Sequence, residues 1–297
     1  MKDLKKIELK GINAKIKRDK DYKKKIDELY NKNIKAAQKE IERVVAKNSG
    51  DKVDINNLKT RADTDDVDSL EEDFEEYQDQ ELNYYEKEQI KNTKVNRRMS
   101  KLEYLYAYAL LKTFRNSRQE QKNLEMHLRA EVKEEKKRLQ EDYGFKQLAL
   151  PPDVIEKFFK ESRYSDYIWA NQQDLIADLK KGIRRTIYKG EHPYKWSKTL
   201  EKHLKKTTAN YTYVARRIAV TETTKIQIAY QIESFKENGY TKMMWVCEPT
   251  ACQDCMPFDG EVFDIGSSHE VPPMHPFCMC SLAPVNEYIY SWVNREY

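Results

Sequence analysis

The stretch Leu102-Glu-Tyr-Leu-Tyr-Ala-Tyr-Ala-Leu110 lies in a run, from Asn96 to about Tyr143, that holds almost no helix-breaking residue. The run predicts one long helix, ended by Gly144, because apolar side chains recur at the spacing of one helix face. Residues 131–141 carry mixed charges and few apolar side chains. We expect this later part to project from the core or to pack against another chain. The apolar positions of the face are Leu102, Leu105, Tyr106, Ala109 and Leu110.

Further helices are predicted after Pro151-Pro152, a pair that we interpret as a domain boundary. One begins at residues 165–169 and is closed by Gly190, a shorter one covers 197–206, and a longer one covers 211–238 and stops at Gly239. The first of these helices carries an apolar stripe that predicts a buried face. The stripe consists of Ile168, Trp169, Leu175, Ile176, Leu179 and Ile183.

The pattern changes after Gly239 to short strands. Three are predicted, at 242–247, 261–265 and 281–285, with a turn at Asp259-Gly260 and a loop that contains Pro272-Pro273. Cys247 lies in the first strand and is interpreted as a small buried hydrophobic residue.

Four of the five cysteines lie in two clusters, Cys252-Gln-Asp-Cys255 and His275-Pro-Phe-Cys278-Met-Cys280. Two cysteines separated by two residues can face one ion, and the second cluster can complete a tetrahedral zinc shell. Four ligands must come from these five residues, and the spacing leaves open which four. A zinc deaminase has His-x-Glu before its Cys-x-x-Cys, and this order is absent here, so the pattern favours a structural zinc over a catalytic one. The alternative is a set of reduced, partly buried thiols without an ion.

These elements predict a mainly α fold with a small α+β C-terminal domain. Long charged N-terminal helices would be followed by a helical domain and by a short-stranded lobe clipped by zinc. The chain has 297 residues, of which 35% are charged and 39% hydrophobic, so the material for cores is limited. No run of eighteen apolar residues and no apolar secretory core near Met1 are present. We therefore expect no membrane span and a reducing cytoplasmic setting.

Charge divides the first half of the chain. Residues 1–48 hold sixteen Lys and Arg against eight acids, residues 62–88 hold thirteen acids and one lysine, and the turn Asn48-Ser-Gly-Asp51 separates the two blocks. We predict a basic helical arm over 1–50 and an acidic segment with the long helix over 51–150. The arm is either a solvated helix face or a contact for DNA phosphates or an acidic partner. Its candidate DNA contacts are Lys15, Lys17, Arg18, Lys20, Lys23, Lys24 and Lys25.

Glu222 falls on the same side of its predicted helix as Ile218, Lys225 and Ala229, which places it against the core. A buried carboxylate must be paired or protonated. Neither Arg216 nor Arg217 is three or four residues away, so we expect a partner from another element and a structural role. The alternatives are an active-site glutamate and a plainly exposed residue.

Several of these residues together resemble the phage head morphogenesis family, which includes the Mu protein F-like domain and minor head proteins of tailed phages. The resemblance covers roughly residues 95–285, and its C-terminal motifs are the specific part. Many relatives have Arg where this chain has Met279. The resemblance predicts a Mu F-like domain over 151–297 with its Cys/His cluster at 247–280, and structural roles for Arg217, Glu222 and Trp245. The motifs, in order, are Arg217…Thr221-Glu222, Trp245, Cys252-x-x-Cys255, Gly260-x-Val-Phe263 and Pro272-Pro273-x-His275-Pro276-x-Cys278-x-Cys280.

The resemblance implies a non-enzymatic minor head protein that associates with the portal vertex in procapsid assembly, with a part in genome packaging or ejection. Its partners would be the portal protein, other head or scaffolding proteins and double-stranded DNA. It would lie in the virion, in the head interior or at the portal vertex, and in the host cytoplasm during assembly. A second interpretation is a DNA-binding or ejected virion protein that uses the basic arm.

A third interpretation, an ADP-ribosyltransferase-like enzyme, follows from a distant kinship proposed for the family domain. Such an enzyme needs an arginine and a catalytic glutamate on different elements around a cleft. Arg217 and Glu222 lie on one predicted helix, and the C-terminal region has no Glu-x-Glu pair. The sequence therefore disfavours enzymatic activity.

Overall fold

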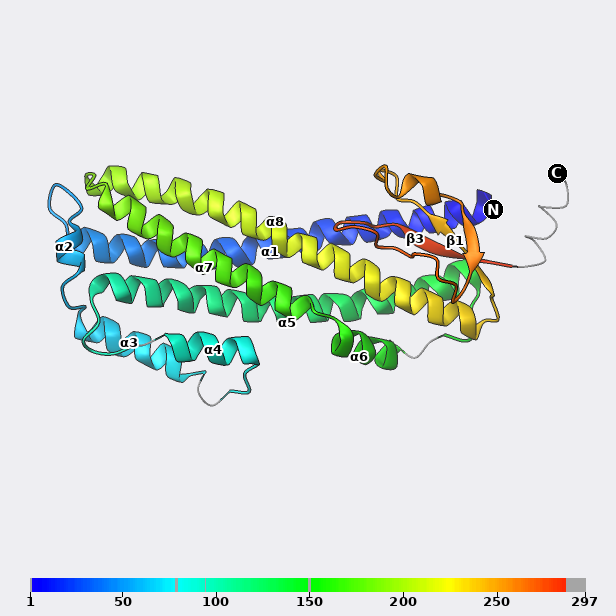
Figure 1. Cartoon of the computed structure of the whole chain (residues 1–297), viewed down its shortest axis with the longest axis horizontal. Helices are drawn as coiled ribbons and strands as arrows, with labels where there is room; N and C mark the ends of the chain where they lie inside the picture. The colour runs from blue at the N-terminus through cyan, green and yellow to red at the C-terminus, as the bar shows by residue number, and fades with distance from the viewer. Residues whose placement is uncertain (1, 78–79, 94, 149–150, 287–297) are drawn as a thin grey trace. The chain divides into compact units, whose positions relative to one another are not determined.

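The computed structural model describes residues 2–77, 80–93, 95–148 and 151–286. Its helices precede a small sheet (Figure 1), so the predicted mainly α fold with a short-stranded C-terminal part is confirmed. The strands are β1 (Lys242–Val246), β2 (Val262–Asp264) and β3 (Ser281–Val285). The helices are α1 (Lys2–Lys47), α2 (Ile55–Leu58), α3 (Thr64–Glu75), α4 (Tyr84–Asn92), α5 (Lys101–Tyr143), α6 (Pro151–Glu161), α7 (Tyr164–Tyr188) and α8 (Pro193–Glu237). None of these helices is long and apolar enough to span a membrane.

The long helix predicted from the opening stretch is confirmed as α5. It ends at Tyr143, and Gly144 follows with a left-handed φ of 67°. It begins at Lys101, later than the predicted Asn96. The backbone N–H of Ser100 donates to Glu103 Oε2 (2.7 Å) and the N–H of Glu103 donates to Ser100 Oγ (3.2 Å), so a capping box fixes the start.

The two helices predicted at 197–206 and 211–238 are one continuous helix, α8, so the predicted break was wrong. Residues 207–210, Thr-Thr-Ala-Asn, contain neither glycine nor proline to interrupt the backbone hydrogen bonds. Thr208 is buried, and its hydroxyl donates to the carbonyl of Leu204 at 2.8 Å, which is compatible with a helix. The end is as predicted, with Gly239 at a φ of 76°.

The chain forms two compact units, each assembled from separate stretches of sequence. Unit 1 consists of residues 1–25, 122–165 and 216–297, and unit 2 of residues 26–121 and 166–215. The domains predicted from the sequence are consecutive ranges, and that division stays a prediction; its last eleven residues, 287–297, lie outside the described residues. The pair Pro151-Pro152 begins α6, within unit 1.

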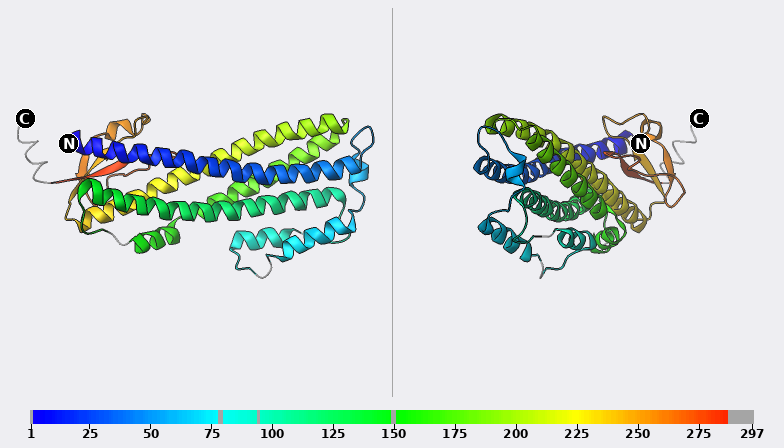
Figure 2. Two further views of the ribbon diagram at one scale, coloured as in Figure 1. Left: turned by 180° about the vertical axis from the view of Figure 1, so that it is seen from behind. Right: turned by 60° about the vertical axis from the view of Figure 1, so that its left-hand side comes forward.

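Unit 1 contains the antiparallel sheet, in the order β2-β1-β3, with Met244 opposite both Val262 and Ala283. The first turns of α1 cover one face of it (Figure 2), where Ile12 packs in a buried cluster with strand residues. Burying one such side chain contributes about 1.5–3 kcal/mol. The start of α1 is therefore part of the core of this lobe. The cluster comprises Ile12, Met244, Val246, Ala283 and Val285, with Leu4, Leu9, Ile16 and Val262 packed against it.

Aromatic side chains from the loops before and after β2 pack on the opposite face of the sheet. The fully buried Trp245 lies against Phe258, with ring centroids 5.1 Å apart. Phe263 stacks on His269 at 3.9 Å. These aromatic contacts fix the loop that carries the first cysteine pair.

Buried charges line the packing of α1 on α5 in unit 1. Arg138 donates to Glu8 (2.7 Å) and, through two nitrogens, to Glu135 (2.9 and 2.5 Å). Burial raises the pKa of Glu8, and Arg138 offsets only part of this effect. Burial acts on Glu135 in the same direction, but the charge and hydrogen bonds of Arg138 lower its pKa overall.

The expectation that 131–141 projects from the core was wrong. Glu131, Val132, Glu135 and Leu139 are all buried within unit 1. Arg18 donates two hydrogen bonds of 2.7 Å to Glu131, so the carboxylate is neutralised where it is buried. A stretch rich in charges was compatible with packing because the buried carboxylates, Glu131 and Glu135, have arginine partners.

Unit 2 contains the remainder of α1, the first parts of α5 and α8, and most of α7, with α3 and α4 beside α5 (Figure 1). The predicted apolar stripe of α7 is buried, and its Trp169 packs on Phe114 at 5.7 Å. At Gly182 a Cβ atom would lie 2.0 Å from Nε2 of His203, so α7 and α8 approach closely there.

A buried carboxylate without a cation lies in unit 2. The hydroxyl of Tyr30 donates to Glu120 Oε2 at 2.6 Å, and within the described chain no Lys or Arg pairs with Glu120. Burial raises the pKa of Glu120 to about 7, with the bond from Tyr30 acting in the opposite direction. The carboxyl is therefore protonated in the folded state over a pH range in which the unfolded chain has lost the proton.

We expect Glu120 to make unit 2 less stable as the pH rises. Its folded pKa lies above the unfolded value of 4.5, so its contribution is complete below pH 4.5 and is lost by about pH 7. The loss amounts to about 3 kcal/mol. Glu120→Gln should remove this pH dependence, measured by urea unfolding across that window. Glu134→Gln, on an exposed position of the same helix, is the control, and identical pH profiles for wild type and Glu120→Gln would contradict the prediction.

Candidate metal centre

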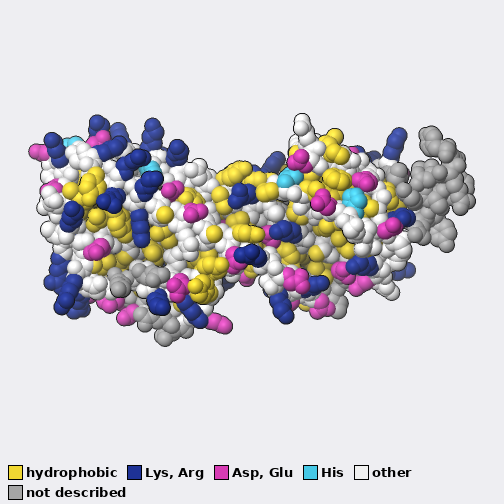
Figure 3. All heavy atoms as spheres, in the orientation of Figure 1, with side chains coloured by type: hydrophobic (Ala, Val, Ile, Leu, Met, Phe, Trp, Pro, Cys, Tyr) yellow, Lys and Arg dark blue, Asp and Glu magenta, His cyan; other side chains and the backbone are white. Residues whose placement is uncertain are grey.

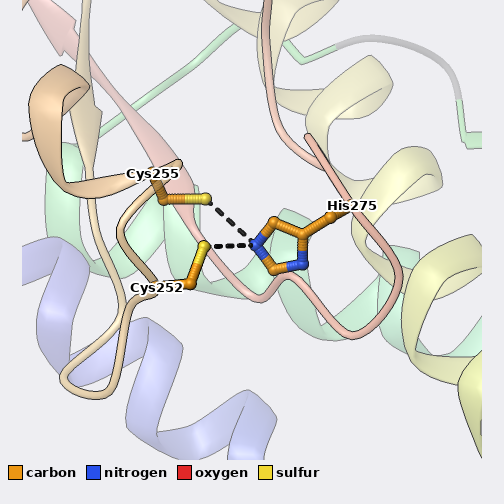
Figure 4. A group of neighbouring side chains, drawn as sticks. All are labelled: Cys252, Cys255 and His275. Atoms are coloured by element: carbon orange, nitrogen blue, oxygen red, sulfur yellow. Dashed lines mark hydrogen bonds between the residues drawn. The ribbon is translucent and has the colours of Figure 1, made fainter.

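The two predicted Cys/His clusters meet in unit 1 (Figure 4). Cys252 and Cys255 follow β1, and His275 and Cys278 lie in the loop before β3. Nε2 of His275 is 3.0 Å from Sγ of Cys252 and 3.2 Å from Sγ of Cys255. Two segments separated by about twenty residues thus direct three ligand atoms at one point.

Cys278 is buried and lies beside Cys255, outside the group of Cys252, Cys255 and His275. Its Sγ is 3.8 Å from Sγ of Cys255. Two thiolates on one tetrahedral zinc lie about 3.8 Å apart, because each Zn–S bond is about 2.3 Å. Cys255, Cys278 and Cys280 form a second group whose sulfur atoms lie within 4.8 Å of one another. Cys255 belongs to both groups and is the sulfur that they share.

Local backbone structure presents the ligands. The N–H groups of Cys255 and Met256 donate to the carbonyl of Cys252 (3.2 and 3.1 Å), which forms the tight turn of a Cys-x-x-Cys pair. In the second segment Phe277 has a φ of 68°, and its N–H donates to the hydroxyl of Thr221 on α8 (3.3 Å). Thr224, one turn further along α8, donates to the carbonyl of Cys278 at 2.8 Å. The cysteine loop is therefore anchored on α8.

The imidazole of His275 is oriented for ligation through Nε2. Its Nδ1 lies 2.8 Å from the carbonyl oxygen of Pro276, the outer contact that fixes the tautomer of a metal-bound histidine. Burial lowers the pKa of His275, but the Pro276 carbonyl and the neighbouring sulfurs outweigh it and raise the pKa overall.

Two of the three thiols have lowered pKa values, and the third has a raised one. A hydrogen bond from Cys280 lowers the pKa of Cys278 to about 5. Backbone hydrogen bonds at Cys255 lower the pKa of Cys252. Burial raises the pKa of Cys255, so this thiol needs a cation nearby to become a thiolate. The donor set fits zinc, although the N···S distances also fit the reduced thiols considered above.

Cys247 is buried, as predicted, and lies outside both groups. Its thiol donates to the carbonyl of Cys255 at 3.1 Å, so it supports the turn that presents a ligand. Cys280 is fully buried at the edge of β3 and lies behind Cys278. Both cysteines thus lie next to Cys255, Cys247 at its carbonyl oxygen and Cys280 in the second group of sulfur atoms.

The other predicted structural residues have different surroundings. Glu222 is buried and accepts from the hydroxyl of Ser162 (2.8 Å), a partner from another element, and from Lys225 Nζ (2.7 Å) on its own helix. Trp245 is buried in β1, whereas the side chain of Arg217 is exposed. Arg216, which precedes Arg217, pairs with the buried Asp19 of α1 at 2.6 Å.

The candidate DNA contacts on α1 divide into two groups. Lys15 is buried with its Nζ 3.4 Å from the hydroxyl of Thr224, and Arg18 pairs with Glu131, so both side chains serve unit 1. The other five are exposed, and contact with DNA stays a prediction for them. They are Lys17, Lys20, Lys23, Lys24 and Lys25.

A second basic region was missed by the sequence reasoning. Residues 180–206 hold ten Lys and Arg against two acids, Glu191 and Glu201, a stronger imbalance than that of 1–48. Figure 3 shows Lys and Arg side chains gathered over the end of α7 and the start of α8. Counting charges in a shorter window would have found it.

Comparison with known proteins gives one match, to the family described as Phage Mu protein F like protein, over residues 177–283. The matched range begins in α7, includes α8 and ends in β3, so it contains all five candidate ligands and Glu222. No curated protein and no solved structure matches the chain.

Proposed function

We propose that this chain, whose residues 177–283 match the family described as Phage Mu protein F like protein, is a minor head protein that associates with the portal vertex during procapsid assembly. Membership in the family implies a protein of phage head morphogenesis with a place in the virion and other head components as partners. The family match is the observation that carries the proposal. The portal protein, scaffolding proteins and a part in genome packaging or ejection are the finer steps that we add to it.

The metal has a structural role in this proposal. We assign zinc to Cys252, Cys255, His275 and Cys278, because the ligand atoms of the first three lie within 4.8 Å of one another and the sulfurs of Cys255 and Cys278 have the spacing of two zinc-bound thiolates. An ion there would join the loop after β1 to the loop before β3, and Thr224 would connect both to α8. Such a clip suits a lobe whose sheet has only three short strands.

The environment of Glu222 supports a non-enzymatic protein. Its two carboxylate oxygens accept hydrogen bonds from Ser162 and Lys225, and the residue is buried. The exposed Arg217 does not share its surroundings. A catalytic pair of the ADP-ribosyltransferase type would need both groups at one accessible cleft. The family is likewise a structural one.

The proposal is tested by co-expressing the tagged chain with the portal, scaffolding and major head proteins of the same phage. We expect the portal protein to co-purify with the chain and procapsids to contain it. The tagged major head protein, expressed with the portal in the absence of the chain, is the control for indirect capture. The proposal would be overturned if the chain were purified without portal protein and if heads assembled without the chain were packaged normally.

A test by deletion of residues 1–48 would not separate assembly from DNA binding. The deletion removes Ile12 from the sheet core and Glu8 from the buried charge cluster, so unit 1 itself would be damaged. Point substitutions of exposed lysines are required instead.

A further inference from the structure

We propose that a basic hollow on α7 binds the phosphate backbone of a nucleic acid. The hollow has a volume of about 640 Å³ and lies entirely within unit 2. It goes beyond the proposed head function and does not depend on the metal. We call it the α7 hollow, and its lining consists of Tyr106, Lys180, Lys181, Arg184, Arg185 and Tyr188.

The spacing of these residues forms two parallel rows on one helix. Lys180, Arg184 and Tyr188 follow one another at intervals of four, and Lys181 and Arg185 form the adjacent row. Successive members of a row lie about 6 Å apart, because an α-helix rises 1.5 Å per residue. Four cations are therefore concentrated over little more than one turn of α7.

The fold does not account for this concentration of charge. Among the residues that the structure describes, no carboxylate forms an ion pair with any of the four cations. Like charges at intervals of four destabilise a helix. Elsewhere in unit 2 arginines do have acidic partners, as Arg115 has in Asp73 (2.8 Å). The helix C-terminus attracts cations, but only within its last turn, which does not extend to Lys180 and Lys181.

The tyrosines supply ring surfaces beside the charges. Tyr188 is 52% exposed, and the guanidinium carbon of Arg184 lies 5.4 Å from its ring centroid. Tyr106 is half-buried on the α5 side of the hollow. Guanidinium groups bind phosphate oxygens in pairs, and an exposed tyrosine ring can stack on a base. A hollow of this volume is large enough for a nucleotide unit.

The charges around the hollow favour a polyanion over a single small anion. Residues 180–206 carry a net charge of +8, from ten Lys and Arg and two Glu. Such a field attracts a long phosphate backbone and raises its rate of association. This region is distinct from the lysines of α1 that were predicted to contact DNA.

The test measures binding of the full chain to a labelled double-stranded oligonucleotide and to one of its single strands, over a series of salt concentrations. The test variant carries Lys180→Ala, Lys181→Ala, Arg184→Ala and Arg185→Ala. We expect it to bind at least about tenfold more weakly and to lower the slope of log affinity against log salt by about 4, one for each lost phosphate contact. Alanine favours helices, so this variant and the control described next should keep the wild-type melting temperature.

The matched control carries four exposed lysines from outside both basic regions changed to alanine, Lys133, Lys146, Lys157 and Lys160. It should bind DNA as the wild type does. Tyr188→Ala and Tyr188→Phe distinguish single-stranded from double-stranded nucleic acid as the source of the phosphates. If only the alanine variant loses affinity, and only for the single strand, the Tyr188 ring stacks on a base. Equal losses in the control and α7 variants, no effect of the α7 variant, or wild-type binding to polyglutamate but not to either oligonucleotide would overturn the proposal. Portal co-purification, measured in parallel, reports on the head function independently.

Discussion

Replacing Cys255 with serine is expected to destabilise unit 1 by several kcal/mol. Cys255 Sγ lies 3.2 Å from His275 Nε2 and 3.8 Å from Cys278 Sγ, and zinc binding and folding are coupled in a small lobe of this kind. Chemical unfolding with and without a chelator measures the effect. The wild type should lose stability when chelator is added, whereas Cys255→Ser should already be weakened and should respond little.

Two other cysteines provide the controls. Cys280→Ser and Cys247→Ser change buried thiols that lie outside the four proposed ligands. Each should cost only about 1–3 kcal/mol, the range for a poorly satisfied buried polar group, and should leave the chelator response intact. A wild type indifferent to chelator, with all three variants equally affected, would favour the reduced-thiol alternative.

Removing the arginine of the buried cluster is the second substitution with a large expected effect. Arg138→Met leaves Glu8 and Glu135 buried without their cation, which should cost about 3–5 kcal/mol. Without Arg138 the folded pKa values of both carboxyls would be raised, so stability would be retained at acid pH and lost as the pH rises. Urea unfolding at several pH values measures both effects.

Lys10→Met is the matched control for Arg138→Met. Lys10 also joins α1 to α5, through Asp142 at 3.2 Å, but its side chain is 78% exposed. Exposed ion pairs contribute at most about 1 kcal/mol, so this variant should be nearly neutral. Similar losses in the two variants would show that the buried cluster is not a major source of stability.

Local patterns were sufficient for much of the fold. The apolar spacing in 102–110 located α5, the glycines at 144 and 239 located helix ends, and alternation after Gly239 located all three strands. Cysteine spacing predicted that the two clusters would meet. The contact expected for Glu222 from another part of the chain is provided by the hydroxyl of Ser162, but the local ion pair with Lys225, three residues away, was missed.

Contacts between distant segments were not predictable in the same way. Ile12 packs on Ala283, more than 250 residues away, and nothing in the amphipathic pattern of α1 identifies the surface that its apolar side meets. Glu131 and Glu135 follow the pattern of a solvated helix face, and only the three-dimensional positions of Arg18 and Arg138 explain their burial. Residues 207–210, three of which are polar, were left out of the predicted helices, but helix propensity is a weak signal and α8 continues through them.

The metal content of the purified full chain tests the central claim most directly. Elemental analysis of protein prepared without chelator should give one zinc per chain for the wild type and for Cys280→Ser, and well under one for Cys255→Ser. A wild-type value well under one, for protein that is folded, would contradict a zinc-clipped lobe.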